Sequence, residues 1–318
     1  MTAKMISAAL LGAMTLLTVT GQQAAAADKN ILMVLWKEGM EADQVFKSTL
    51  TDLGIDASFQ EINAKQDRAA LAGQLRGLED DIANKVYDAV YTYGTVGTQL
   101  TTSVVRDQSP IVFNIVFNPV AAKLVQSLEA PGVPITGVTN GVPVADQLDT
   151  FNALTPIKKL LVLYNVREPN SVLVEKDVAQ WAEENGVTVV SSRVAPGTDT
   201  LKTILADVAS GKIDVDSCYA GADSYLASAA KEVQAAIGDK VHLYGGTQTY
   251  VARGGWLATY APHNQDMGIT AAEQMAKVLG GADPATLPVL LPEPKLFISQ
   301  AAAAQHGVTP PPDAALED

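Results

Sequence analysis

Residues 87–117 read YDAVYTYGTVGTQLTTSVVRDQSPIVFNIVF and contain the unit from which the fold class follows. Residues 87–93 are typical of a buried strand, residues 95–106 of a helix, and residues 110–117 of the next strand. The same alternation continues on both sides, at residues 31–35, 41–53, 55–62, 67–85 and 120–128. Strands that alternate with helices in this rhythm predict a parallel sheet with helices on both faces, an α/β fold.

The pattern starts again after residues 131–143, which are rich in Gly, Pro and Thr and predict a crossing to a second lobe. Strands are expected at residues 159–164, 187–194, 215–219 and 241–244, and helices at residues 146–154, 171–185, 200–209 and 223–237. Two similar α/β halves joined in the middle predict two Rossmann-like lobes with a ligand cleft between them.

The C-terminal part does not continue the second half simply. It contains a predicted strand at 256–260, a helix at 266–279, and a last strand and helix within 295–306. We expect the helix to pack on lobe 1 and the last two elements on lobe 2. Lobe 1 is therefore assigned residues 28–142 and 261–285, and lobe 2 residues 143–260 and 286–318.

The first 27 residues have the layout of a secretory signal peptide. Lys4 precedes an apolar run at residues 6–19, and residues 24–27 are all alanine. The apolar run is shorter than the roughly 20 residues that span a bilayer. We therefore predict cleavage near Asp28 and a soluble protein of the periplasm, without a lipid anchor because no cysteine lies at the cleavage site. The alternative is a buried N-terminal helix.

Composition excludes several functional classes. The formal net charge is −13 at pH 7, which argues against nucleic acid or an anionic membrane as a partner. Cys218 is the single cysteine and is expected to be a buried thiol. His242, His263 and His306 are scattered without metal-ligand spacing, so neither a metal nor a cofactor is expected. Without a G-x-S-x-G turn or a P-loop, the chain is not expected to be an enzyme.

A first candidate binding element follows the strand at 87–93. Gly94, Thr95 and Thr98 lie where that strand leads into a helix. Ligands bind outside the carboxyl ends of parallel strands, and a helix start offers free N–H groups and a positive dipole end. This turn therefore predicts a site for a carboxylate or a phosphate. The alternative is a helix N-cap at Thr95 with close packing at the glycines.

A second candidate, in the other lobe, has the opposite charge. Asp223 follows the strand at 215–219 and could receive an ammonium group, or could cap the next helix instead. A donor-rich turn that faces an acid across a cleft suits a zwitterion such as an amino acid. Four further candidates lie at the ends of predicted strands. Trp36 could stack on a ligand or be a packing residue, and the other three carry polar or aromatic groups. The three are Asn118, Asn165 and Tyr260, of which the asparagines could be turn residues only.

The chain resembles the periplasmic substrate-binding components of ABC importers, in the subgroup of tryptophan/tyrosine-type binding proteins. Residues 118–129, NPVAAKLVQSLE, match the family's D-P-V-x-A-G-L-V-x-S-L-x, and residues 135–138, ITGV, match the end of its N-V-T-G-V. Further matches are Gly94–Thr95, Tyr260, Gly268, Lys277–Gly281, Pro294–Leu296, Ala303 and Gly307–Val308. The chain departs from the family pattern at Asn118, where the family has Asp, and at Lys123, where it has a small residue.

The resemblance implies a type I binding-protein fold, with three segments between the lobes and a hinge that closes on the ligand. It also implies membrane permease and ATPase subunits as partners. We expect a monomer that binds an amino acid or a related small molecule, with an aromatic amino acid as one option. A soluble sensor that presents its ligand to a membrane receptor is the main alternative, and an enzyme on the same fold is a weaker one.

Overall fold

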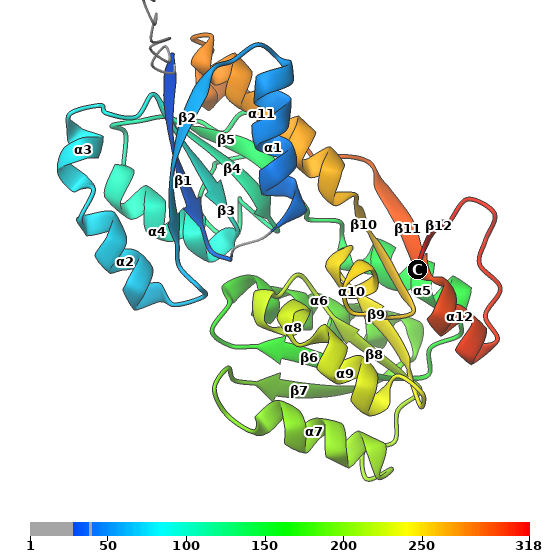
Figure 1. The fold of residues 1–318 in the computed structure, drawn as a ribbon. Coiled ribbons are helices and arrows are strands. Elements are labelled where there is room, and N and C mark those ends of the chain that lie inside the picture. The colour runs from blue at the N-terminus through cyan, green and yellow to red at the C-terminus, as the bar shows by residue number, and fades with distance from the viewer. Residues whose placement is uncertain (1–27, 38–39) are drawn as a thin grey trace, which may run out of the picture.

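A computed structural model describes residues 28–37 and 40–318, so the predicted signal peptide at 1–27 lies outside the described residues. Figure 1 shows two lobes, each built on a sheet with helices on both faces. The predicted two-lobed α/β fold is therefore confirmed. Within the described part of the chain, no helix is long and apolar enough to cross a membrane.

The sheet of lobe 1 is parallel throughout, with the order β2-β1-β3-β4-β5 among the described residues. Its strands are β1 (Lys29–Leu35), β2 (Ala57–Asn63), β3 (Ala89–Tyr93), β4 (Ile111–Val116) and β5 (Ile135–Thr139). Its helices are α1 (Glu41–Asp52), α2 (Arg68–Arg76), α3 (Glu79–Ala83), α4 (Thr95–Val105) and α11 (Asn264–Leu279).

The sheet of lobe 2 has the order β12-β11-β10-β9-β8-β6-β7, and β11 runs antiparallel to β10. Its strands are β6 (Lys159–Asn165), β7 (Thr188–Val194), β8 (Ser217–Ala220), β9 (His242–Gly245), β10 (Ala258–Pro262), β11 (Pro294–Ser299) and β12 (Ala315–Glu317). Its helices are α5 (Val144–Leu154), α6 (Pro169–Asn185), α7 (Thr200–Ala209), α8 (Ser224–Ser228), α9 (Ala230–Ile237), α10 (Thr249–Ala252) and α12 (Gln300–His306). A 3-10 turn, η1 (Pro284–Thr286), precedes the return to β11.

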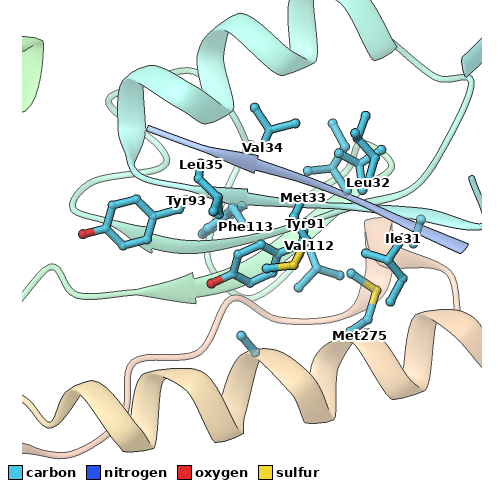
Figure 2. Close-up of a cluster of buried hydrophobic side chains, with 14 of the residues drawn as sticks. Ile31, Leu32, Met33, Val34, Leu35, Tyr91, Tyr93, Val112, Phe113 and Met275 are labelled. Atoms are coloured by element: carbon cyan, nitrogen blue, oxygen red, sulfur yellow. The ribbon is translucent and has the colours of Figure 1, made fainter. Parts of the chain in front are cut away.

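Burial on both faces explains why the central strands of lobe 1 are apolar runs rather than alternating patterns. Residues 31–34 of β1 are all fully buried, as are most residues of β3 and β4. Figure 2 shows side chains of β1 on both faces of the sheet, with Met275 of α11 packed against one of them. The core thus holds the strand ends, which carry the cleft residues, in fixed positions.

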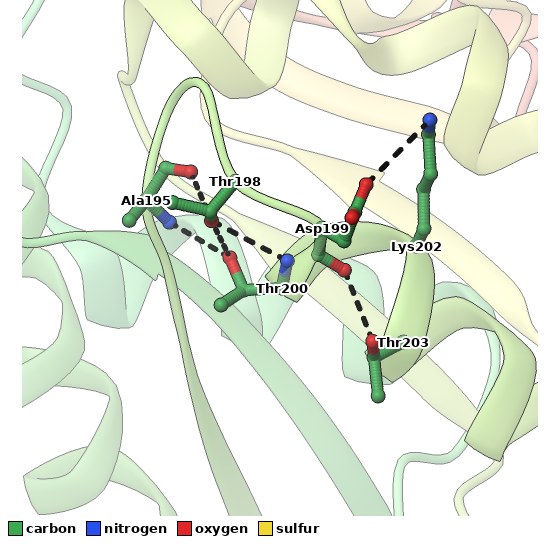
Figure 3. A network of polar contacts seen from close by, with 6 residues as sticks. All are labelled: Ala195, Thr198, Asp199, Thr200, Lys202 and Thr203. Atoms are coloured by element: carbon green, nitrogen blue, oxygen red, sulfur yellow. Dashed lines mark hydrogen bonds and ion pairs between the residues drawn. The ribbon is translucent and has the colours of Figure 1, made fainter.

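Short polar turns start several helices, and the turn between β7 and α7 illustrates how (Figure 3). The Thr200 hydroxyl accepts a hydrogen bond from Ala195 N at 3.1 Å, and the Thr198 hydroxyl donates to Ala195 O at 2.7 Å. One turn later, the Thr203 hydroxyl donates to Asp199 O. The Thr200 hydroxyl thus gives Ala195 N an acceptor in the turn, while Ala195 O and Asp199 O each accept from a hydroxyl in addition to a backbone N–H.

Helix α11 follows the passage of the chain from the lobe 2 sheet to lobe 1 and packs against α1, as predicted. A Cβ at Gly268 would lie 2.6 Å from Ala42 O and 2.8 Å from Val45 Cβ. The two helices therefore approach so closely that only glycine fits at this contact. The buried face of α11 otherwise joins the lobe 1 core through Met267, Ala271 and Met275.

Gly268→Ala should destabilise the protein by about 2 kcal/mol, because the extra methyl group overpacks the contact by more than alanine gains in helix propensity. Gly73→Ala is the matched control, since Gly73 lies within α2 with no atom within 4 Å of an added Cβ. The control should be stabilised by about 0.5–1 kcal/mol in chemical denaturation. Equal effects of the two substitutions would contradict the close helix contact.

Three predicted elements were wrong in detail. Residues 120–128 form turns instead of a helix, because Lys123 has a positive φ of 58° and Leu124 N donates to Pro119 O. The helices expected at 67–85 and 223–237 are each split in two. Strands β5 and β12 were not predicted. In the case of β5, the strand lies within the Gly- and Pro-rich segment that was interpreted as a crossing between the lobes.

The lobe boundaries stay a prediction. Strand pairing differs from the predicted assignment at two places. Residues 261–262 belong to β10 in the lobe 2 sheet, although they were assigned to lobe 1. Leu290 bridges Val138 of β5 in the lobe 1 sheet, although the assignment placed residues from 286 onward in lobe 2. The chain therefore crosses after 262 and returns after 290, because backbone pairing with a sheet edge decides where each segment lies.

Candidate ligand-binding site

A pocket of about 740 Å³, including its opening to solvent, lies between the two lobes. Its walls come from residues at or after the ends of β1, β3, β4 and β5 in lobe 1 and of β6, β8, β9 and β10 in lobe 2. The pocket is therefore at the carboxyl ends of the strands of both sheets, where open parallel sheets bind ligands. Its lining combines apolar side chains with a small number of buried polar ones, which is typical of small-molecule sites.

The start of α4 forms the lobe 1 wall. Gly94 has a φ of 80°, a left-handed conformation that turns the chain from β3 into the helix, and Thr95 is the first helical residue. The Trp36 side chain packs against this turn, 3.5 Å from a Cβ built at Gly94 and 3.4 Å from one built at Gly97. The first N–H groups of an eleven-residue helix thus lie beside the pocket with the positive end of its dipole.

Two buried carboxyl groups form the opposite wall, in lobe 2. Asp223 is 3% exposed, and its Oδ1 accepts a hydrogen bond from Leu226 N at 2.7 Å, which caps α8. Glu168 is 5% exposed, and both of its carboxyl oxygens accept from Ser224 N at 3.1–3.2 Å. The chain therefore brings two acids together at the starts of α6 and α8, which follow neighbouring strands of the sheet.

Burial determines the protonation of these acids. It raises the pKa of Glu168, and the negative charge of Asp223 raises it further. Burial also raises the pKa of Asp223, against the effect of Leu226 N and of the Ser171 and Asn165 side chains, which lower it. Two carboxylates this close in a desolvated site are therefore costly to ionise together, and a cation would stabilise the ionised pair.

One lysine of the pocket lies on the other wall. Burial lowers the pKa of Lys37, and the positive charge of Arg253 lowers it further, while Glu168 raises it. The negative charge of Glu168 in lobe 2 therefore acts on Lys37 across the cleft. This residue and the start of α4 supply positive charge from lobe 1, whereas lobe 2 supplies the two acids together with the positive charge of Arg253.

Four buried polar atoms of pocket residues find no hydrogen-bond partner among the described residues. Three are acceptors, namely Asp223 Oδ2, Asn170 Oδ1 and Asn140 Oδ1, and one is a donor, Trp36 Nε1. The Ser171 and Asn165 side chains lie close enough to the Asp223 carboxyl to lower its pKa. An unpaired buried polar group costs about 1–3 kcal/mol, so such groups commonly mark a place that a ligand fills. Three acceptors suit a group with several N–H donors.

Four of the predicted site residues meet in this pocket. Trp36, Gly94 and Thr95 line it from lobe 1, and Asp223 lines it from lobe 2. Asp223 caps α8, which was one of the two alternatives considered for it, and its role as an ammonium site stays a prediction. Thr95 makes no side-chain cap, because Gly94 occupies the N-cap position of α4.

Two other predicted residues are structural instead. Thr98 is fully buried, and its hydroxyl bonds to Gly94 O at 2.8 Å and to the Thr92 hydroxyl, so it stabilises the first turn of α4 from within the lobe. Asn118 is exposed outside the pocket, and its Oδ1 accepts from Ala121 N at 2.9 Å. Asn118 is thus the turn residue that was its alternative.

The last two predicted residues lie beside the pocket but do not line it. Asn165 is buried behind Asp223, and its Oδ1 accepts from Arg167 N at 3.0 Å in the turn that leads to α6. Tyr260 packs on the hydrophobic cluster of lobe 2, because alternation along β10 points its side chain away from the cleft. Its neighbour Ala261 lines the pocket in its place.

Sequence reasoning missed Glu168, Asn170, Asn140 and Lys37. A usable pattern was present at Glu168, since an acid directly before Pro169 marks the start of a helix after a strand. Asn140 lies between β5 and α5, in the segment that was read as a crossing. Its position beside the pocket depends on the path of that crossing, which no local pattern predicts.

The chain belongs to the family of ABC transporter substrate binding proteins, whose family model matches residues 30–316. The predicted family is therefore confirmed, and the architecture is that of type I periplasmic binding proteins. A curated relative, the tyrosine-binding protein of Clostridioides difficile, is 29% identical over 216 residues, which cover 67% of this chain and 61% of that protein. The match thus spans about three fifths of the length of the curated relative.

Solved structures match over more of the chain. The ABC domain from Streptococcus pneumoniae in complex with L-Trp has a TM-score of 0.77 and 25% identity, over 91% of this chain and 99% of that one. A conserved domain protein from Vibrio cholerae has a TM-score of 0.79 and 25% identity over the same shares. The family and these neighbours make the chain a substrate-binding protein of the ABC transporter type.

Proposed function

We propose that this protein is the extracytoplasmic solute-binding component of an ABC importer, and that it binds an amino acid or a related zwitterion between its lobes. The observation that carries the proposal is the pair of buried acids, Glu168 and Asp223, opposite the start of α4. The ammonium group of the ligand lies against Asp223 Oδ2, with Asn170 Oδ1 and Asn140 Oδ1 as further acceptors. Its carboxylate accepts from the N–H groups at the start of α4 and from Trp36 Nε1.

The remaining part of the ligand occupies the apolar part of the pocket. Met40, Phe117 and Met267 line this part, and Tyr93 and Trp36 add aromatic surface. The tyrosine-binding relative and the neighbour in complex with L-Trp support an aromatic amino acid as the ligand. Aromatic rings bury a large apolar area and stack on other rings, which fits this lining.

A ligand that contacts both lobes stabilises the closed arrangement over the open one, because only the closed arrangement offers both sets of contacts. The three segments between the lobes are then the hinge. The closed form docks on the permease, whose ATPase drives release. The predicted signal peptide at residues 1–27 supports export, and we expect the mature protein to act as a monomer in the periplasm.

Thermal unfolding of the protein from Asp28 onward, refolded to remove carried ligand, tests the proposal against amino acids, aromatic acids, short peptides, nucleosides and sugars. A ligand at about 100 times its dissociation constant should add about 2.7 kcal/mol of stability. A midpoint increase with one class of amino acids is the expected result. An increase with sugars or nucleosides alone would contradict the zwitterion site, while the family membership would stand.

A further inference from the structure

Ile115, near the end of β4, has an unusual backbone conformation for its residue type. Its φ is 56°, in the left-handed region that a β-branched side chain strongly disfavours. The register between β4 and β5 shifts at this point, since Asn114 is opposite Val138 and Val116 is opposite Thr139, with Ile115 as the extra residue. Ile115 is therefore the bulged residue of a β-bulge.

The bulge separates the side-chain directions of three consecutive residues. Asn114 is fully buried and donates a hydrogen bond to the Tyr91 hydroxyl at 3.1 Å, and Val116 is fully buried in the lobe 1 core. Between them, Ile115 is only partly buried and lines the pocket. Bulges next to binding sites commonly redirect a side chain in this way.

A glycine would make the same backbone turn without strain, because it has no Cβ to clash at positive φ. Position 115 therefore carries an isoleucine in a strained backbone conformation that glycine would adopt without strain. What the isoleucine adds is a branched apolar side chain in the lining of the pocket, to which Met40 and Met267 also contribute. Strained conformations of this kind persist when the side chain they hold in place serves the site.

We propose that Ile115 determines ligand specificity: the bulge in β4 holds its side chain at the apolar end of the pocket, where it limits the size of the group that a ligand can carry. This inference rests on the proposed function, because it assigns a size limit to the side-chain end of an amino-acid site. Removing the side chain should enlarge that end and favour larger ligands.

Calorimetric titration of L-valine, L-phenylalanine and L-tryptophan into wild type, Ile115→Ala, Ile115→Gly and Ile115→Val measures the effect. In the alanine and glycine variants, affinity for L-tryptophan relative to L-valine should rise at least about tenfold, the scale that a few methylene groups set in an apolar pocket. The valine variant should change this ratio by less than about threefold. Ile62→Ala is the control, since Ile62 packs on the same core from β2 outside the pocket and should leave the ratio unchanged.

Melting without ligand tests the strain separately. Ile115→Gly should melt at or above Ile115→Ala, because alanine keeps the unfavourable positive φ and glycine does not. A lower midpoint for the glycine variant, or an unchanged ratio in both variants, would overturn the inference while wild-type binding upholds the proposed function. Failure of wild type to bind any amino acid of the unfolding panel would remove the proposed function, and this inference with it.

Discussion

Asp223→Asn should weaken binding of an amino-acid ligand at least about 100-fold. The substitution keeps the shape of the side chain and an oxygen that can accept from Leu226 N, but it removes the negative charge opposite the ligand's ammonium group. Loss of one partner from a buried, hydrogen-bonded charge pair costs about 2–5 kcal/mol, and 100-fold corresponds to about 2.7 kcal/mol. Calorimetric titration of wild type and variant with the ligand identified in the unfolding panel measures the difference.

The same variant should be more stable than wild type in the absence of ligand. It removes one of two buried acids that repel each other, so the free energy of unfolding should rise by about 1 kcal/mol. Asp283→Asn is a matched control, because Asp283 caps η1 through Ala285 N on the exposed surface and away from the pocket. A decrease in affinity of less than about fivefold, in a folded variant, would exclude Asp223 as the ammonium site.

Ligand affinity should increase with pH, by at least about tenfold between about pH 5 and pH 8. The pKa values of Glu168 and Asp223 are raised above their ordinary values, chiefly by burial, so the pair holds a proton in the lower part of this range. A bound ammonium group must displace that proton, which costs up to tenfold in affinity for each pH unit below the pKa. The amino-acid ligand itself does not titrate in this range, so the change reports on the protein.

Stability without ligand should change in the opposite direction. An acid whose pKa is raised in the folded state binds its proton more tightly in that state. Its contribution to stability is therefore complete at pH values below the pKa of the unfolded state, and it is lost as the pH rises through the pKa of the folded state. Asp43, whose pKa burial raises to about 7 against a hydrogen bond from the Tyr91 hydroxyl, contributes with the same sign from the lobe 1 core. The free energy of unfolding should therefore fall from about pH 4 to about pH 7.

Glu168→Gln separates the two pH effects. The variant should bind with a flatter pH profile, since one of the two coupled acids is gone, while Asp43 keeps its part of the stability change. Titrations in buffers of different ionisation enthalpy would count the protons released on binding. An affinity independent of pH in wild type would contradict displacement of a proton by the ligand.

Most of the fold could be predicted because local patterns and tertiary structure agree in the regular α/β units. The apolar run at 31–35 and the strand–helix–strand unit at 87–117 became β1, β3, α4 and β4 nearly as expected. Prediction failed where backbone conformation departs from local preference. A positive φ at Lys123 prevents a helix that its neighbours favour, and a positive φ at Ile115 produces a bulge inside an apolar run that reads as a regular strand.

The candidate site was predictable to the extent that strand ends identify it. Trp36, Gly94, Thr95 and Asp223 directly follow strands or their short extensions, so topology alone brings them to one edge. Glu168 was missed because an acid in a loop is normally solvated, and its burial depends on the packing of α8 against the end of β6. Such contacts between distant segments have no counterpart in a local sequence pattern.

Calorimetric titration with three related probes, L-tryptophan, tryptamine and indole-3-propionate, tests most directly whether the two lobes recognise the two charges of a zwitterion. The probes share one ring but carry the zwitterion, the ammonium group alone or the carboxylate alone. L-tryptophan should bind at least about 100-fold more tightly than either of the others, because each lacks a charge that one lobe receives. Binding of all three with similar affinity would show that the ring alone is recognised and would contradict a site built from opposite charges on two lobes.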